Sequence, residues 1–371
     1  SGDFVDSILD AKGDTDVVMI TTIFFALFFL CATQDIAVDG WALTMLSKEN
    51  VGYAATCNAA GQALGNMLSF VGFLALKDHL TLGTNMKIWG ALFLVSTTIV
   101  AYFKKEETCH DIPELVTAYK EMALVCKLSS VQRLCMVLLT SKIAFAATEA
   151  ISLLKLQDAG MPKQHIGYMA TLVGVFAVII PGFVKDYTAG KTPFQLFTKL
   201  YVPRLCLNAL MVAVIYGSPK PWPETFTFGK IVFYVGLLLI SLCQTVVSTA
   251  MFVGQVGLFA KISDPRIGGT YMTLLNTVAN LAFKWPLSCS YFIIDLLTSK
   301  DADGQYIVDG FYPFVVVTTG IGLYWARSSA KTINQLEQAP LSFWKVPMTS
   351  GKKTPSATNE DEGLSLLPTG P

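Results

Sequence analysis

The sequence predicts an all-α polytopic membrane protein with about nine transmembrane helices. Hydrophobic residues make up 53% of the 371 residues and charged residues only 15%, which is too apolar for a soluble domain of this length. The bilayer is therefore the solvent for most of the chain. The segments long enough to cross roughly 30 Å of hydrocarbon as helices are 17–46, 51–76, 88–103, 134–154, 166–184, 201–216, 231–260, 268–297 and 311–326.

The distribution of Lys and Arg orients these spans. Segments that would share one side with the C-terminus carry 17 basic residues and the opposite side carries 8, while Lys142 and Lys284 fall inside spans. By the positive-inside rule the C-terminus is cytoplasmic and the acidic N-terminal segment is lumenal or extracellular. The formal net charge is zero, and nucleic acid is not a predicted partner.

The spans divide into three plus six around the longest polar connection. Three helices before a central loop and six after it are the pattern of a two-half transporter of twelve spans without its first three. We therefore expect a fragment or an alternative product. The predicted parts are a lumenal acidic segment 1–16, a partial N-terminal half 17–103, a cytoplasmic loop with an amphipathic helix 104–133, a C-terminal six-helix half 134–326, and a largely disordered cytoplasmic tail 327–371.

Three polar residues interrupt the first predicted helix. Gln34, Asp35 and Asp39 follow an apolar run without a turn signal, and Asp35 lies roughly 27 Å along the helix from its start. Carboxylates at membrane depth are unfavourable unless they face protein or water. This position near the cytoplasmic interface favours a gate or a latch between helices, with a coupling or cargo role as the alternative.

Lys142 is the predicted contact for an anionic cargo. It lies about 12 Å from the cytoplasmic end of span 134–154, near the midplane where transporter sites cluster. A lone ammonium at that depth requires an anion, which can be a cargo group or a carboxylate of the protein. Glu149, two turns further along the same face, is the candidate for charge balance.

A polar stripe marks the eighth predicted span. Asn276, Asn280 and Lys284 recur every four residues, so they share one helix face, which we expect to point into the bundle. Gln244 marks the preceding span in a similar way. Hydrogen bonds between helices and the lining of a cargo cavity are both compatible with this pattern, and we include all four in the predicted substrate site.

An enzyme is not predicted. The three histidines, His79, His110 and His165, all fall in predicted loops, so an intramembrane catalytic base has no candidate. The sequence also contains no metal-ligand cluster, no nucleophile constellation and no cofactor motif.

Four stretches carry a family resemblance. Residues Ala32 to Asn58, Ser263 to Leu281, Leu138 to Lys142 and Tyr187 to Gly190 resemble the acetyl-coenzyme A transporters of the endoplasmic reticulum membrane, a branch of the major facilitator superfamily. The resemblance covers about residues 17–326. It implies a major-facilitator-type helical bundle in a multi-pass protein of that membrane.

The resemblance also implies a cargo and a mechanism. Acetyl-CoA would move from the cytosol to the lumen by alternating access, in exchange for CoA, to supply lumenal acetylation, and the CoA phosphates would be the anions for Lys142. Bacterial muropeptide permeases share the element from Gln34 to Asp39, so a permease for another anionic amphiphile is the alternative, together with a non-transporting truncated product. A homodimer is a further expected partner arrangement.

Overall fold

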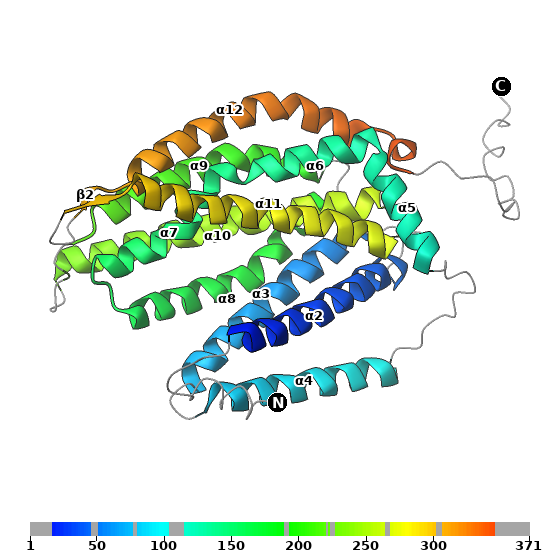
Figure 1. Cartoon of the computed structure of the whole chain (residues 1–371), viewed down its shortest axis with the longest axis horizontal. Helices are drawn as coiled ribbons and strands as arrows, with labels where there is room; N and C mark the ends of the chain where they lie inside the picture. The colour runs from blue at the N-terminus through cyan, green and yellow to red at the C-terminus, as the bar shows by residue number, and fades with distance from the viewer. Residues whose placement is uncertain are drawn as a thin grey trace, which may run out of the picture.

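The computed structural model describes residues 17–45, 51–76, 80–103, 115–188, 193–219, 222, 227–263, 268–301 and 306–345, mostly as long helices packed side by side (Figure 1). The elements in chain order are α2 (Val17–Met45), α3 (Val51–Leu76), α4 (Leu82–Phe103), α5 (Leu115–Lys127), α6 (Ser129–Ser141), α7 (Ile143–Asp158), α8 (Lys163–Thr188), α9 (Phe194–Tyr216), α10 (Phe228–Ile262), α11 (Gly268–Leu297), β1 (Ser299–Lys300), β2 (Tyr306–Val308), α12 (Phe311–Gln338) and η2 (Leu341–Trp344).

These elements confirm an all-α polytopic membrane protein. In the described part of the chain, six stretches are long and apolar enough to cross a membrane, namely 18–38, 83–103, 129–158, 163–183, 194–216 and 228–262. Helices α3, α11 and α12 contain 26, 30 and 28 residues, so they also have the length of a span, although they carry more polar side chains. The small antiparallel hairpin of β1 and β2 connects α11 to α12.

Several helix boundaries differ from the sequence prediction, and α12 continues to Gln338 rather than ending at residue 326, so the first part of the predicted tail 327–371 is helical. Helix α4 begins at Leu82 rather than at residue 88, and α9 begins at Phe194 rather than at residue 201. The predicted span 134–154 is two helices, α6 and α7, which meet at Lys142. Polar residues at the ends of these helices lower the local hydropathy but do not prevent helix formation. A prediction based on the length of apolar segments therefore misplaces these helix ends.

The main hydrophobic core lies among α6, α9, α10, α11 and α12, with side chains from α7 and η2. Its largest fully buried side chains include Phe145, Phe197, Tyr201, Phe259 and Trp344. By contrast, α2 and α4 expose most of their apolar side chains, and α4 lies along the outside of the bundle (Figure 1). Apolar side chains on the surface are expected where a helix faces lipid, since hydrocarbon is as apolar as the side chains themselves.

The hairpin after α11 fastens the carboxyl end of α7. Lys155 Nζ pairs with Asp309 Oδ2 at 2.7 Å and lies 4.4 Å from the ring centre of Tyr306. The Tyr306 hydroxyl donates to Asp158 Oδ2 at 3.3 Å. This end of α7 is therefore held to the connection between α11 and α12.

The opposite end of the bundle is fastened by η2. Trp344 is fully buried, and its backbone carbonyl accepts a hydrogen bond from the Tyr271 hydroxyl of α11 at 3.2 Å. Ser130 of α6 donates its hydroxyl to the Phe343 carbonyl at 2.8 Å. The segment after α12 thus ties together the ends of α6 and α11.

Glu337 caps the amino end of α9. Its Oε1 accepts the backbone N–H groups of Phe194 at 2.6 Å and Gln195 at 3.2 Å, in the role usually played by an N-cap side chain. Burial raises the pKa of the Glu337 carboxyl and outweighs these two hydrogen bonds, which act in the opposite direction.

Glu337→Ala is expected to destabilise the protein by about 1 kcal/mol, the usual loss for a helix cap. Because the folded-state pKa is raised, the pH-dependent part of the stabilisation is fully present below the unfolded-state pKa and is lost as pH rises through the folded-state pKa. The difference in thermal unfolding between the wild-type chain and Glu337→Ala should therefore be larger at pH 4 than at pH 7. A difference that grows towards pH 7 would contradict this account.

Candidate functional site

The site begins at a helix break. Helix α6 ends at Ser141 and α7 begins at Ile143, with Lys142 between them at φ −99° and ψ −1°. No proline or glycine interrupts the sequence here. Within a bilayer, a break of this kind is tolerated only where neighbouring helices satisfy the released backbone groups.

Side chains of other helices satisfy the carbonyls at the end of α6. The Tyr201 hydroxyl of α9 donates to the Ser141 carbonyl at 2.8 Å, and Trp285 Nε1 of α11 donates to the Leu139 carbonyl at 3.0 Å. The Ser141 hydroxyl donates to the Leu138 carbonyl at 2.8 Å. The break is therefore a specific tertiary feature rather than a frayed helix end.

The break presents Lys142 as a half-buried ammonium. Among the described residues, the polar partner of Nζ is the Ala279 carbonyl of α11, at 3.5 Å. An ammonium has three N–H donors, so two are available to a ligand. The Lys142 and Lys284 ammonium groups lie 5.8 and 5.6 Å from the ring centre of Phe283, which brings two cations to one aromatic side chain.

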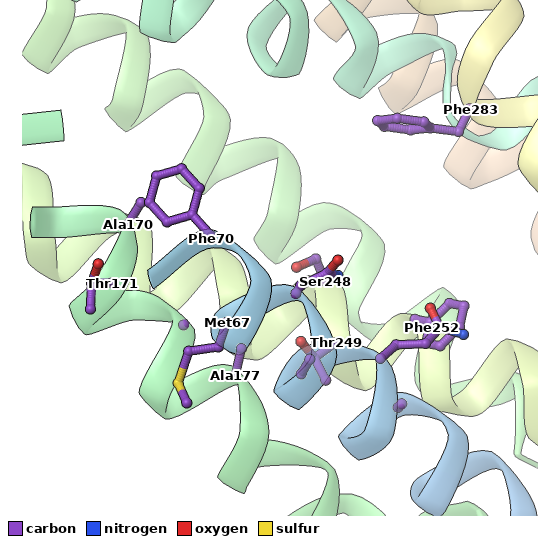
Figure 2. A pocket seen from close by; sticks show the side chains of 14 residues that line it. Met67, Phe70, Ala170, Thr171, Ala177, Ser248, Thr249, Phe252 and Phe283 are labelled. Carbon is purple, nitrogen blue, oxygen red and sulfur yellow. The ribbon is translucent and has the colours of Figure 1, made fainter. Parts of the chain in front are cut away.

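Phe283 also lines a cavity. This cavity of 790 Å³ lies between α3, α8, α10 and α11, and Figure 2 shows Phe283 across the open space from Met67 and Ala177. Its lining mixes apolar and polar side chains: Ala59, Gln62, Ala63, Asn66, Met67, Phe70, Ala170, Thr171, Gly174, Ala177, Ser248, Thr249, Phe252 and Phe283. Its volume is in the usual range for small-molecule sites, about 300–1,000 Å³.

A second cavity, of 280 Å³, lies between α7, α9 and α10. Its lining is mainly polar and comprises Thr148, Glu149, Ser152, Leu153, Arg204, Asn208, Met211, Ser241, Gln244, Thr245 and Ser248. Arg204 Nη2 forms an ion pair with Glu149 Oε1, and the guanidinium lies 4.3 Å from the ring centre of Phe145. Since Ser248 lines both cavities, the two are adjacent.

The second cavity contains unused hydrogen-bonding groups. Gln244 Nε2 donates to Asn208 Oδ1 at 3.0 Å, which leaves Asn208 Nδ2 buried without a partner in the described structure. The buried Ser152 hydroxyl is likewise without a partner there. Buried polar groups are nearly always hydrogen-bonded, so these atoms are suited to a polar ligand or to water.

The structure brings several of the predicted substrate residues together. Glu149 and Gln244 line the same cavity, and Lys142 and Lys284 approach the same phenylalanine of the neighbouring one. The expected stripe on α11 is not uniformly packed inside the bundle, because Asn276 is half-buried whereas Asn280 and Lys284 are exposed. That face of α11 is therefore partly open in this conformation.

The predicted gating residues on α2 lie apart from both cavities' linings. Gln34 and Asp35 are exposed and form no hydrogen bond or ion pair within the described part of the chain. The side chain of Asp39 lies outside the described residues. Helix α2 packs against α11, so a gating role for this segment stays a prediction.

Sequence reasoning missed Arg204 and Asn208. Arg204 lies close to the start of the predicted span 201–216 and is counted there with the basic residues of the cytoplasmic side. Because α9 begins at Phe194, the structure places both Lys199 and Arg204 within the helix. The sequence feature that could have identified Arg204 is its spacing to Asn208, since two polar residues four positions apart share a helix face.

The helical architecture defines the class of protein as a polytopic membrane protein, with two adjacent cavities between its helices. A family model described as Acetyl-coenzyme A transporter 1 matches residues 3–117 and 107–306. The chain therefore belongs to the acetyl-coenzyme A transporter 1 family. A transporter with a small-molecule cargo is the function that this membership establishes.

The individual relatives share 26–29% sequence identity with this chain. An uncharacterised protein of Schizosaccharomyces pombe is 29% identical over 388 residues, covering 91% of this chain and 71% of the relative. An uncharacterised membrane protein of Saccharomyces cerevisiae is 26% identical over 428 residues, covering 88% and 75%. A Rickettsia prowazekii protein named as an AmpG 1 transporter is 26% identical over 120 residues, covering 32% and 27%. No solved structure matches the chain.

Proposed function

We propose that this protein carries acetyl-CoA from the cytosol into the lumen of the endoplasmic reticulum, in exchange for CoA. The observation that carries the proposal is the Lys142 ammonium, which has two donors without a partner among the described residues and lies at a helix break close to Phe283 of the 790 Å³ cavity. Phosphate groups of a CoA thioester are anions that such an ammonium can bind. Family membership supports the acetyl-CoA part of the proposal.

The two cavities suit a cargo with both charged and uncharged parts. The Lys142 and Lys284 ammonium groups lie near Phe283 of the larger cavity, which also offers apolar contact through Met67 and Phe252. Arg204 lines the smaller cavity, where it is paired with Glu149. In the proposed arrangement, residues 17–103 and 134–326 move against each other around this region, and Gln34, Asp35 and Asp39 act at the gate. The loop 104–133 and the tail 327–371 are cytoplasmic in this proposal.

Uptake by proteoliposomes tests the proposal. The full chain is purified and reconstituted with unlabelled CoA inside, and labelled acetyl-CoA is added outside. Saturable uptake that depends on internal CoA is the expected result. If uptake is the same in vesicles with and without internal CoA, the proposed exchange is wrong. If no labelled acetyl-CoA enters the vesicles under any gradient, acetyl-CoA is not the cargo.

A permease for another anionic amphiphile is the second candidate, and the similarity to an AmpG 1 transporter favours it. Competition separates the two candidates in the same vesicles. CoA and acetyl-CoA should compete with the labelled substrate if the first proposal is correct. A muropeptide that is itself taken up, while CoA has no effect, would support the second.

The proposed orientation makes a labelling prediction. Single cysteines introduced near Lys120 in α5 and near Gly304, between β1 and β2, should react with a membrane-impermeant maleimide from opposite sides, the former from the cytosol. Sealed microsomes before and after permeabilisation provide the measurement, in a background in which the native cysteines are replaced. If both cysteines react from the same side of the membrane, the predicted number of spans between the two positions is wrong.

A further inference from the structure

A polar groove lies between α6 and α12, on the side of the bundle away from α2, α3 and α4 (Figure 1). It consists of two adjoining hollows of 370 and 400 Å³ that share Arg133 and Thr332. We call it the α6–α12 groove. Its lining residues are Ser129, Gln132, Arg133, Met136, Val137 and Thr140 of α6, Ser329, Thr332, Gln335 and Leu336 of α12, and Ala339, Pro340 and Phe343 beyond α12.

The charge of the groove is positive. Arg133 is exposed and has no ion pair within the described part of the chain, and none of the lining residues is a carboxylate. The nearby Glu337 is buried on another face of α12, where it caps α9. A guanidinium with five free donors is the side chain best suited to bind a phosphate through two parallel hydrogen bonds.

The groove also holds unused neutral donors. The side chains of Ser129, Ser329, Thr332 and Gln335 form no hydrogen bond with any described residue. Helical serine and threonine residues commonly satisfy their hydroxyls on the carbonyl one turn earlier, as Thr140 does here with Met136 at 2.8 Å. These groups therefore remain available to the oxygen atoms of a headgroup.

The groove is polar at one end and more apolar further along, as a phospholipid is from its headgroup to its acyl chains. Arg133 lies near the start of α6, at the boundary between the central loop and the membrane, and Met136 and Val137 follow one turn deeper. The deep end is closed by the hydrogen bond from Trp325 Nε1 to the Thr140 hydroxyl at 2.8 Å. Basic pockets between transmembrane helices at this depth bind anionic lipid headgroups.

We propose that the α6–α12 groove is a binding site for an anionic phospholipid. The phosphate contacts Arg133, the polar headgroup contacts the free hydroxyl and amide groups, and one acyl chain lies along Met136 and Val137. This inference rests on the proposed orientation of the protein only for the leaflet, which is the cytoplasmic one. Because η2 forms one end of the groove, the lipid also contacts the segment that ties α6 to α11.

Native mass spectrometry of the full chain in detergent tests this site. The probes are dioleoyl-phosphatidylinositol, dioleoyl-phosphatidylcholine and soluble inositol 1-phosphate, each titrated against the wild-type chain. Arg133→Gln removes the guanidinium, Arg133→Lys keeps the charge, and Thr332→Val removes one free hydroxyl. Arg327→Gln is the matched control, because Arg327 is an exposed arginine on α12 that does not line the groove.

Arg133→Gln is expected to weaken phosphatidylinositol binding at least about fivefold, Arg133→Lys to retain part of the affinity, and Arg327→Gln to change it less than about twofold. Phosphatidylcholine should bind more weakly than phosphatidylinositol to the wild-type chain. Equal losses in Arg133→Gln and Arg327→Gln would overturn the site in favour of general surface charge. If inositol 1-phosphate binds as tightly as phosphatidylinositol, the ligand of the groove is a soluble phosphate and not a lipid. Each readout is independent of transport, so failure here is distinct from failure of the proposed cargo.

Discussion

Arg204→Ala is expected to abolish transport and to destabilise the protein by up to about 3 kcal/mol. The substitution leaves the Glu149 carboxylate in a membrane-embedded cavity without its partner, and breaking a buried ion pair on one side costs about 3–5 kcal/mol. The lower end of this range is an upper value here because the pair is only partly buried: the side chains of Arg204 and Glu149 are 13% and 26% exposed, and Glu149 as a whole residue is exposed. Thermal unfolding in detergent measures the loss of stability.

A double substitution separates folding from function at this pair. Arg204→Met combined with Glu149→Gln removes both charges and should recover most of the stability, since replacing a buried pair by residues of similar volume is often neutral. Transport should remain absent if Arg204 binds the anionic cargo. Transport by the double variant at the wild-type rate would instead show that the pair is only structural.

Lys142→Ala is expected to weaken CoA binding by more than about 1 kcal/mol, the upper value for an exposed ion pair. The ammonium lies half-buried at the helix break with two donors unused, so its attraction to a phosphate is screened less than at the surface. Lys142→Arg should retain part of the affinity, because the charge remains while the geometry changes. Isothermal titration of CoA into the purified chain provides the measurement.

Lys331→Ala is the control for Lys142, because Lys331 is an exposed lysine on α12 that lines neither cavity of the site. It should bind CoA like the wild-type chain. Unchanged CoA affinity in a well-folded Lys142→Ala variant would remove Lys142 from the binding site.

The helices follow from the sequence because apolar length in a bilayer is a strong constraint. A segment such as 231–260 has no alternative to a helix in hydrocarbon, and the structure places α10 over the whole of it. The break at Lys142 could not be predicted in this way, because it depends on Tyr201 and Trp285, which are distant in sequence. Local patterns carry no information about such partners.

The site was predictable to the extent that isolated polar residues in apolar spans are conspicuous. This reasoning selected Lys142, Glu149 and Gln244, all of which the structure places at or near the cavities. It missed Arg204 because a basic residue close to a predicted helix end is normally assigned to the loop.

The helix break has a consequence for how motion can pass through the protein. A continuous span transmits tilt as a rigid rod, whereas α6 and α7 share only the backbone at Lys142 and are anchored separately, one by η2 and the other by Asp309. Because Trp285 and Tyr201 hold the released carbonyls, a shift of α9 or α11 would free them to accept other donors. A displacement of α9 or α11 that breaks these two hydrogen bonds is therefore expected to change the angle between α6 and α7.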